Sequence, residues 1–302
     1  MTATSAKSTK RTDTRLPPPA THLDSTAHLM NRISSQLADQ LGLVALDGRR
    51  RRPSASPALV VVAHGSRDPR ALSTVRGLLD RVRALRPGLQ VHLGHIELNA
   101  PLLPDTLAEL DARGTDAAVL VPLLLSRGYH VKRDIPEMAA EARLHTRVAA
   151  PLGPHPLLVD ALHARLTEAG WCAPADEAAR RASGVVLASA GSRDPESRID
   201  TSRTADQLAA RLGVPVVPAY ASAAAPTVPD AVRALAARGR HRVAVASYFT
   251  APGRFATECA RAAPGIAAAP LGTHPSMAHL LLHRYDRTRT TPAATEPELA
   301  SA

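Results

Sequence analysis

From residue 58 onwards, short apolar runs alternate with longer segments of helical character. The apolar runs have the length of buried strands, and the segments between them indicate helices. The predicted strands are 59–63, 91–98 and 117–125, and the predicted helices are 71–85, 104–113 and 134–143. Strands that alternate with helices at this spacing predict an α/β fold, in which helices cover both faces of a parallel sheet.

The second half of the chain repeats the first. The segment AHGSRDP at 63–69 returns as SAGSRDP at 189–195, and PLGPHP at 151–156 returns as PLGTHP at 270–275. Copies that keep their register over such a distance indicate an internal duplication. We therefore expect two tandem lobes, each with its own parallel sheet. The expected ranges are 57–170 for the first lobe, 171–182 for a polar linker and 183–287 for the second lobe.

Residues 1–56 and 288–302 lie outside the repeats, and we expect both to be disordered tails. The first tail holds nine Lys and Arg residues against four Asp residues, so it carries +5 of the formal net charge of +10. Binding of a nucleic acid would therefore depend largely on this tail. Aromatic residues, on which bases stack, are only 2% of the chain. We expect no nucleic-acid partner.

Cysteine content and hydropathy narrow the class of protein further. Cys172 and Cys259 lie far apart, so they form neither a disulfide framework nor a cysteine-rich metal site. The longest apolar run, 117–125, is too short to cross a bilayer. The N-terminus has no apolar core of the kind found in signal peptides. We expect a cytoplasmic protein without a membrane partner.

Candidate metal ligands follow each of the three predicted strands of the first lobe. His64 comes directly after the first strand, Glu97 lies at the end of the second, and His130 lies in the loop after the third. Because ligands bind at the carboxyl ends of parallel strands, we expect these side chains to converge. Two imidazoles and a carboxylate suit Fe²⁺, Co²⁺, Ni²⁺ or Zn²⁺. His95 shares a strand face with Glu97 and stays a candidate.

The second copy lacks all three candidates. Ala190, Ser222 and Arg254 stand where His64, Glu97 and His130 stand in the first copy. We therefore predict one metal site per chain, in the first lobe. The Gly-Ser-Arg-Asp-Pro loop survives in both copies and is predicted to be a structural turn that caps a helix. His155 and His274, which recur in both copies, are predicted to be structural as well.

Three segments of the first lobe together resemble a known enzyme family. They are VVVAHGSR at 60–67, ELNAP at 97–101 and LLLSRGYHVKRDIP at 123–136. They look like the sirohydrochlorin chelatases of the cobalt- and iron-inserting type, and the resemblance extends over both copies, from 58 to about 285. It implies two α/β lobes that face each other across an active-site cleft. It also implies that His64 and His130 bind the metal and accept pyrrole protons, with Glu97 as a third ligand or a proton relay.

The same resemblance implies an acidic tetrapyrrole, sirohydrochlorin, as the partner, and a divalent metal as the second substrate. The metal is Co²⁺ or Fe²⁺, with Ni²⁺ as a further candidate, and no permanently bound cofactor is expected. The chain has no phosphate-binding GxxxxGK[ST] loop, so insertion is expected to need no ATP. Four basic residues are predicted to bind substrate carboxylates. They are Arg127, Lys132, Arg133 and Arg254.

Two other functions are compatible with parts of the sequence. A non-catalytic carrier of divalent metal would use the same ligands, and a nucleic-acid-binding protein would use the basic tail. The choice between cobalt and iron stays open, as does the pathway, which is cobalamin or sirohaem synthesis. A monomer and a homodimer both fit, because a two-lobed chain can form a cleft alone.

Overall fold

A computed structural model of the chain describes residues 56–291. The predictions for the N-terminal tail and for residues 292–302 fall outside this range. The first copy of the repeat contains nine elements. They are β1 (Ala58–Ala63), α2 (Pro69–Leu85), β2 (Val91–His95), α3 (Leu103–Ala112), β3 (Ala117–Pro122), η1 (His130–Asp134), α4 (Ile135–Ala140), β4 (His145–Val148) and α5 (Pro156–Glu168).

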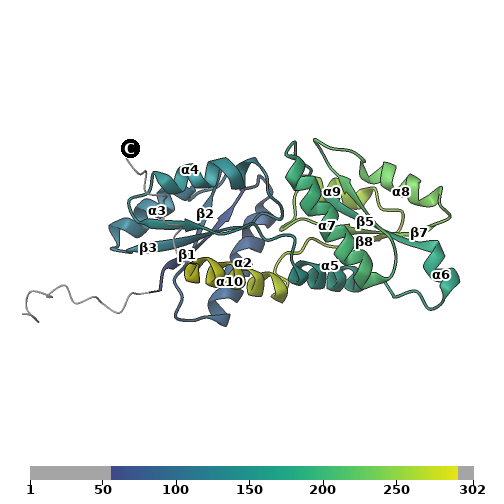
Figure 1. Cartoon of the computed structure of the whole chain (residues 1–302), viewed down its shortest axis with the longest axis horizontal. Coiled ribbons are helices and arrows are strands. Elements are labelled where there is room, and N and C mark those ends of the chain that lie inside the picture. Colours follow the sequence, from purple (N-terminus) through teal and green to yellow (C-terminus); the bar gives the residue numbers. More distant parts are fainter. Residues whose placement is uncertain (1–55, 292–302) are drawn as a thin grey trace, which may run out of the picture. The chain divides into compact units, whose positions relative to one another are not determined.

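The second copy follows the same programme. After α6 (Glu177–Ala182) in the linker, its elements are β5 (Ser183–Ser189), α7 (Pro195–Leu212), β6 (Val216–Tyr220), α8 (Val228–Ala236), β7 (Arg242–Ser247), α9 (Arg254–Arg261), β8 (Ile266–Ala267) and α10 (Pro275–Thr290). Each copy builds a four-stranded parallel sheet, in the order β2-β1-β3-β4 and β6-β5-β7-β8 (Figure 1). The predicted α/β fold with two tandem lobes is confirmed.

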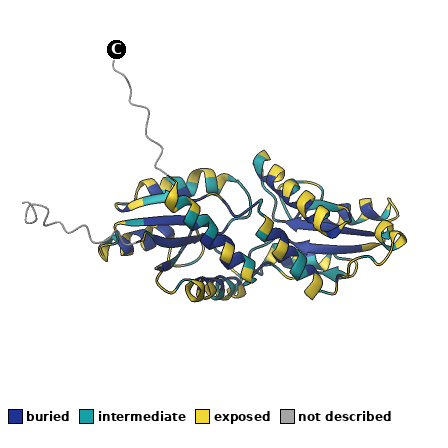
Figure 2. Cartoon of the chain, turned by 60° about the horizontal axis from the view of Figure 1, so that its bottom comes forward, coloured by how far each residue is buried: buried dark blue, intermediate teal, exposed yellow. Residues whose placement is uncertain are grey.

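The central strands are buried on both faces, as continuous apolar runs in parallel sheets should be. Every residue of β1 and of β5 is buried. In Figure 2 the strands form a buried interior, and the exposed residues lie on the outer faces of the helices. None of the helices in residues 56–291 is both long and apolar enough to cross a membrane.

The two copies exchange their last helices. The helix α5 comes from the first copy but packs against α7 and β7, and α10 comes from the second copy but packs against α2 and β3 (Figure 1). One hydrophobic core therefore runs through both sheets and includes Leu59 of β1 and Leu187 of β5. The ranges drawn from the repeat describe the duplication, but the two lobes are not separate in space.

Several element ends differ from the predictions. The second strand ends at His95 and the third at Pro122, because the following residues turn away to form the loops at the sheet edge. The helix predicted over 134–143 is a π-helical turn, η1, followed by the short helix α4. A fourth strand in each sheet was not predicted. The linker contains α6, and α10 continues to Thr290, beyond the expected end at 287.

The recurring loop caps a helix, as predicted, and the recurring histidines, which were predicted only to be structural, are helix caps as well. Asp68 accepts a hydrogen bond from the backbone N–H of Arg70 at the start of α2, and Asp194 does the same for α7. The side chains of His155 and His274 accept hydrogen bonds from backbone N–H groups at the starts of α5 and α10. These residues recur because both copies must begin the same helices.

Candidate functional site

Two imidazoles and a carboxylate meet at the carboxyl edge of the first sheet. The rings of His64 and His130 lie edge to face, with their centroids 4.7 Å apart and their planes at 89°. The Nδ1 atom of His64 lies 3.5 Å from Oε1 of Glu97. All three side chains are partly exposed. The structure thus brings together the three residues that the strand ends indicated.

The group is open. Among residues 56–291, no set of three or more His, Cys, Asp or Glu side chains is close enough to enclose a metal ion. His64 and His130 form a pair, and Glu97 contacts only the first of them. Such an arrangement leaves coordination positions free for a second ligand.

The remaining candidate, His95, does not belong to this group. Its side chain is buried, and its Nδ1 atom lies 3.1 Å from the carbonyl oxygen of Pro101. Burial lowers its pKa, so the ring is held neutral in the interior. His95 is therefore a core residue that joins β2 to the loop before α3.

Asp134 is part of the site and was not predicted. Its Oδ2 atom lies 2.5 Å from Nδ1 of His130, at the far end of η1. A proton on Nδ1 then faces the carboxylate, and the lone pair of Nε2 is left free for a metal ion. The spacing of four positions between His130 and Asp134 was the available signal, because residues at i and i+4 share a helix face. The predicted helix began only at 134, so this signal was not used.

The loop that carries His64 is packed tightly against the loop that carries Glu97. Gly65 has a φ of +102°, and a Cβ atom built on it would lie 1.9 Å from the carbonyl oxygen of Glu97. The backbone N–H of Ser66 donates to the side-chain oxygen of Asn99 at 2.7 Å. Only glycine satisfies both the backbone angle and the close approach. This packing fixes the spacing between His64 and Glu97.

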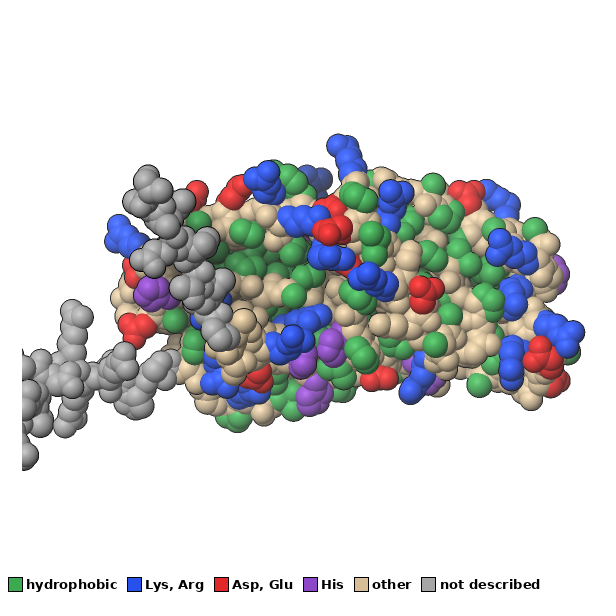
Figure 3. Space-filling model, in the orientation of Figure 1, with side chains coloured by type: hydrophobic (Ala, Val, Ile, Leu, Met, Phe, Trp, Pro, Cys, Tyr) green, Lys and Arg blue, Asp and Glu red, His purple; other side chains and the backbone are tan. Residues whose placement is uncertain are grey.

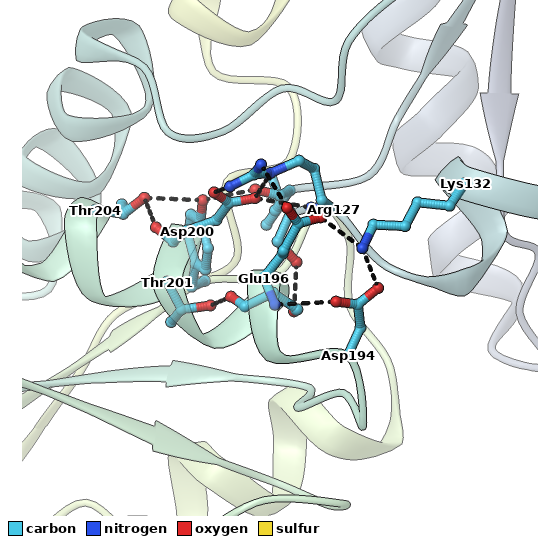
Figure 4. Close-up of polar contacts among 11 residues, drawn as sticks. Arg127, Lys132, Asp194, Glu196, Asp200, Thr201 and Thr204 are labelled. Carbon is cyan, nitrogen blue, oxygen red and sulfur yellow. Dashed lines mark hydrogen bonds and ion pairs between the residues drawn. The ribbon is translucent and has the colours of Figure 1, made fainter.

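Two of the four basic residues assigned to substrate carboxylates contact carboxylates of the protein instead (Figure 4). Arg127 forms a bidentate pair with Asp200, and Lys132 lies 2.7 Å from Asp194 and 2.5 Å from Glu196. The hydrogen bond to Asp194, together with Glu196, raises the pKa of Lys132. Arg127 and Lys132 therefore connect the loop of His130 to α7 and are not free cations.

Arg133 and Arg254 remain exposed. Arg133 lies 3.9 Å from Glu137 within its own helix turn, and Arg254 begins α9 with its guanidinium group over the ring of Phe255. Contacts between exposed side chains contribute little free energy, so both guanidinium groups can exchange them for other partners. On the face shown in Figure 3, basic side chains are spread widely and acidic side chains lie among them.

Comparisons with known proteins find relatives along both copies of the repeat. The CbiX family model matches residues 58–169 and again 184–288. A sirohydrochlorin cobaltochelatase of Methanococcus aeolicus is 35% identical over 81 residues, which are 27% of this chain and 57% of that protein. The enzyme of the same name from Sulfolobus acidocaldarius is 33% identical over 113 residues, which are 37% of this chain and 90% of that protein. The chain spans little more than half the length of the first of these relatives.

Solved structures share the fold. SirB from Bacillus subtilis with Fe³⁺ superposes with a TM-score of 0.66 at 23% identity, covering 78% of this chain and 96% of that one. The sirohydrochlorin chelatase SirB from Bacillus subtilis subspecies spizizenii in complex with cobalt gives 0.64 at 22% identity, with 78% and 97% covered. At 22–23% identity, the similarity between these structures and this chain shows a shared two-lobed fold.

Proposed function

The chain belongs to the CbiX family, and on this premise we propose that it inserts a divalent metal ion, Co²⁺ or Fe²⁺, into sirohydrochlorin. The observation that carries the proposal is the pair of imidazoles at the sheet edge, His64 and His130, with ring centroids 4.7 Å apart. The relatives named sirohydrochlorin cobaltochelatase support the same activity.

Imidazole suits both halves of the reaction. Insertion requires that a metal ion be passed to the ring nitrogens while pyrrole N–H protons leave. A neutral imidazole can bind a metal ion through a ring nitrogen, and once the ion has left, the same nitrogen can accept a proton. In the proposed mechanism the Nε2 atoms of His64 and His130 hold the metal on one face of the macrocycle. As metal–nitrogen bonds form, the imidazoles release the metal and take up the protons.

Glu97 is proposed to relay protons. Its carboxylate lies beside Nδ1 of His64 and is exposed to solvent. A proton accepted on Nε2 of His64 makes the ring a cation, which can then pass its Nδ1 proton to Glu97 and from there to water. The neutral ring then carries its proton on Nε2, and exchange with water returns that proton to Nδ1, which frees Nε2 for the next metal ion. Asp134 is proposed to play the matching part beside His130, by fixing the orientation of that ring.

The metal is proposed to be a passing substrate and not a resident cofactor. A closed cage would retain the ion, whereas a pair of imidazoles with open positions can give it up. This openness disfavours the alternative of a metal carrier, which needs tight binding. Arg133 and Arg254 are the exposed cations proposed to bind substrate carboxylates. One chain carries both lobes, so a monomer suffices, and a homodimer would contain two independent sites.

The proposal is tested by mixing the full-length protein anaerobically with sirohydrochlorin and Co²⁺ or Fe²⁺. Metal insertion changes the absorbance of the tetrapyrrole, so initial rates can be read directly. We expect insertion of at least one of the two metals to be faster than the spontaneous reaction. Rates equal to the spontaneous rate with both metals would overturn the proposal.

A further inference from the structure

The segment that carries His130 is anchored by apolar side chains only at its start, where the partly buried Leu124 and Leu125 pack against the core. Every residue between Leu123 and Ile135 is at least partly exposed, and η1 contains no buried residue. Its backbone is held by the π-helical turn η1, in which the N–H of Ile135 donates to the carbonyl oxygen of His130, and by hydrogen bonds from Val131 and Lys132 to that of Gly128. Packing within the first lobe therefore does little to fix the position of His130.

Polar contacts with α7, in the second copy, replace this packing before His130 (Figure 4). Asp200 has a side chain that is only 1% exposed, and it accepts hydrogen bonds from the backbone N–H of Arg127 at 3.0 Å and from its guanidinium group at 2.9 and 2.7 Å. The hydroxyl group of Ser126 lies 2.8 Å from that of Ser197. Outside α7, Tyr248, which directly follows β7 in the second copy, donates to the carbonyl oxygen of Leu125 at 3.0 Å.

A second group of contacts holds the segment after His130. The Nζ atom of Lys132 lies between the carboxylates of Asp194 and Glu196, in the first turn of α7. Glu196 also accepts a hydrogen bond from Arg127 at 3.1 Å, so it joins both cations. His130 is thus flanked on both sides along the chain by residues attached to the same helix.

Comparison of the two copies shows that α7 of the second copy holds a loop of the first, whereas α2 of the first copy does not hold the corresponding loop of the second. Where α7 has Glu196, Ser197 and Asp200, α2 has Arg70, Ala71 and Thr74. In the loop that contains Arg254, Ala251 stands where Arg127 stands in the first copy. Within the described part of the chain, no ion pair joins that loop to α2. Of the three acidic partners, Glu196 and Asp200 occur only on α7, whereas Asp194 has a counterpart in Asp68.

We propose that α7 is a positioning element for the metal site, and that Arg127 and Lys132 are positioning residues that hold His130 opposite His64. The second copy, which lost the ligand residues, then contributes to metal binding by fixing the loop of the first. This inference rests on the proposed function of the two histidines. It also explains why Arg127 and Lys132 pair with carboxylates of α7 and do not stay free for the carboxylates of an acidic substrate.

The Lys132→Met substitution distinguishes positioning from simple electrostatics. Removal of a positive charge near a cation site should strengthen metal binding, because the repulsion is removed. Loss of a positioning contact should weaken it, since His130 would spend less time opposite His64. We expect about a tenfold weaker affinity for Co²⁺, measured on the full-length protein by the visible ligand-field bands of bound Co²⁺. Lys132→Arg, which keeps the charge and reach, should restore wild-type affinity.

The matched control is the ion pair between Arg86 and Asp286. It also joins the two copies, from the end of α2 to α10, and its side chains are 38% and 37% exposed, against 40% and 39% for Lys132 and Glu196. It lies away from the histidines along both helices. Arg86→Met should lower thermal stability about as much as Lys132→Met and leave the Co²⁺ affinity and spectrum unchanged.

Each result of these measurements either supports or overturns the positioning role of α7. If Lys132→Met binds Co²⁺ as tightly as wild type or more tightly, or if Arg86→Met weakens binding equally, α7 does not position His130. If His64→Ala leaves Co²⁺ affinity unchanged, the metal site itself is wrong and the inference falls with it. If the protein binds Co²⁺ in a manner that depends on His64 and Lys132 but inserts no metal, the positioning stands and the proposed enzyme activity fails.

Discussion

The rings of His64 and His130 lie edge to face with their centroids 4.7 Å apart, although one follows the first strand and the other begins a π-helical turn after the third. The parallel order of β1 beside β3 brings the two loops to the same edge of the sheet. The contact therefore depends on tertiary structure, and each partner that fixes one of the loops should affect the pair.

Asp134 should control the metal affinity of His130. Asp134→Asn keeps the size of the side chain and removes the charge that faces Nδ1. Loss of a carboxylate behind a histidine ligand typically costs about 10–100-fold in metal affinity or activity. We expect a loss in this range for Co²⁺, measured by titration with a competing chelator. Glu137→Gln, one turn further along, is the control and should bind as wild type; equal affinities of Asp134→Asn and wild type would contradict the assignment.

Gly65 and Gly191 provide a matched pair from the repeat. Each has a positive φ, and a Cβ atom on either would lie 1.9 Å from a carbonyl oxygen, that of Glu97 or that of Ser222. Alanine at either position should therefore destabilise the fold by roughly 1–3 kcal/mol, measured by urea unfolding. Only Gly65→Ala should also weaken Co²⁺ binding, because only that loop carries a ligand. Equal metal affinities of the two variants would show that the loop spacing does not matter.

The pair of Arg127 and Asp200 should make the free energy of unfolding depend on pH, because Arg127 lowers the pKa of the Asp200 carboxyl group. Burial alone would raise the pKa of this carboxyl group, but the hydrogen bonds and charge of Arg127 outweigh burial and hold the pKa below its usual 3.8. The ionised group therefore stabilises the fold above about pH 4, and this contribution is lost as the pH falls through the lowered pKa. In Arg127→Met the guanidinium contacts are lost, while burial, the backbone N–H of residue 127 and the charge of Arg203 remain, so the pKa of Asp200 is higher than in wild type.

The free energies of unfolding of wild type and Arg127→Met should consequently converge in acid. We expect the variant to be less stable by about 3 kcal/mol near neutral pH, where it buries an unpaired charge. The gap should narrow as the pH approaches about 4. Urea unfolding at several pH values measures both curves. A gap that stays constant over this range would mean that Asp200 is not the group that Arg127 stabilises.

His155 should contribute a second pH dependence. Burial, followed by the charges of Arg284, His283 and Arg287, lowers its pKa to about 4. A lowered histidine pKa means that the folded state prefers the neutral ring, so stability is full above about pH 6.5 and falls between there and about pH 4. His155→Asn keeps the ability to cap α5 and removes the titrating ring. The variant should show a flatter stability curve over this window, and an unchanged slope would contradict the assignment.

The parts of the fold that follow from local pattern were predictable. Apolar runs located β1 and the start of β3, and the duplication predicted two sheets of the same design. The exchange of α5 and α10 could not be read from the sequence, because both helices are amphipathic and their pattern does not say which sheet they cover. The short strands β4 and β8 are not apolar runs and gave no signal.

The residues of the site that follow strands were predictable, and the long-range partners of its charged residues were not. The strand ends located His64, Glu97 and His130, because parallel topology brings such positions together. The role of Lys132 was not predictable, since a sequence displays a charge but not its partner. The carboxylates of Asp194 and Glu196 lie far along the chain and reach Lys132 only after the second copy has folded against the first.

The most direct test of the account is the initial rate of metal insertion by single-histidine variants. His64→Ala and His130→Ala should each lose nearly all acceleration of Co²⁺ or Fe²⁺ insertion into sirohydrochlorin, while His279→Ala, which removes an exposed histidine of α10, should keep the wild-type rate. Folding of all three is checked by thermal unfolding. Full insertion rates in His64→Ala and His130→Ala would contradict the account, because the paired imidazoles would then have no part in the reaction.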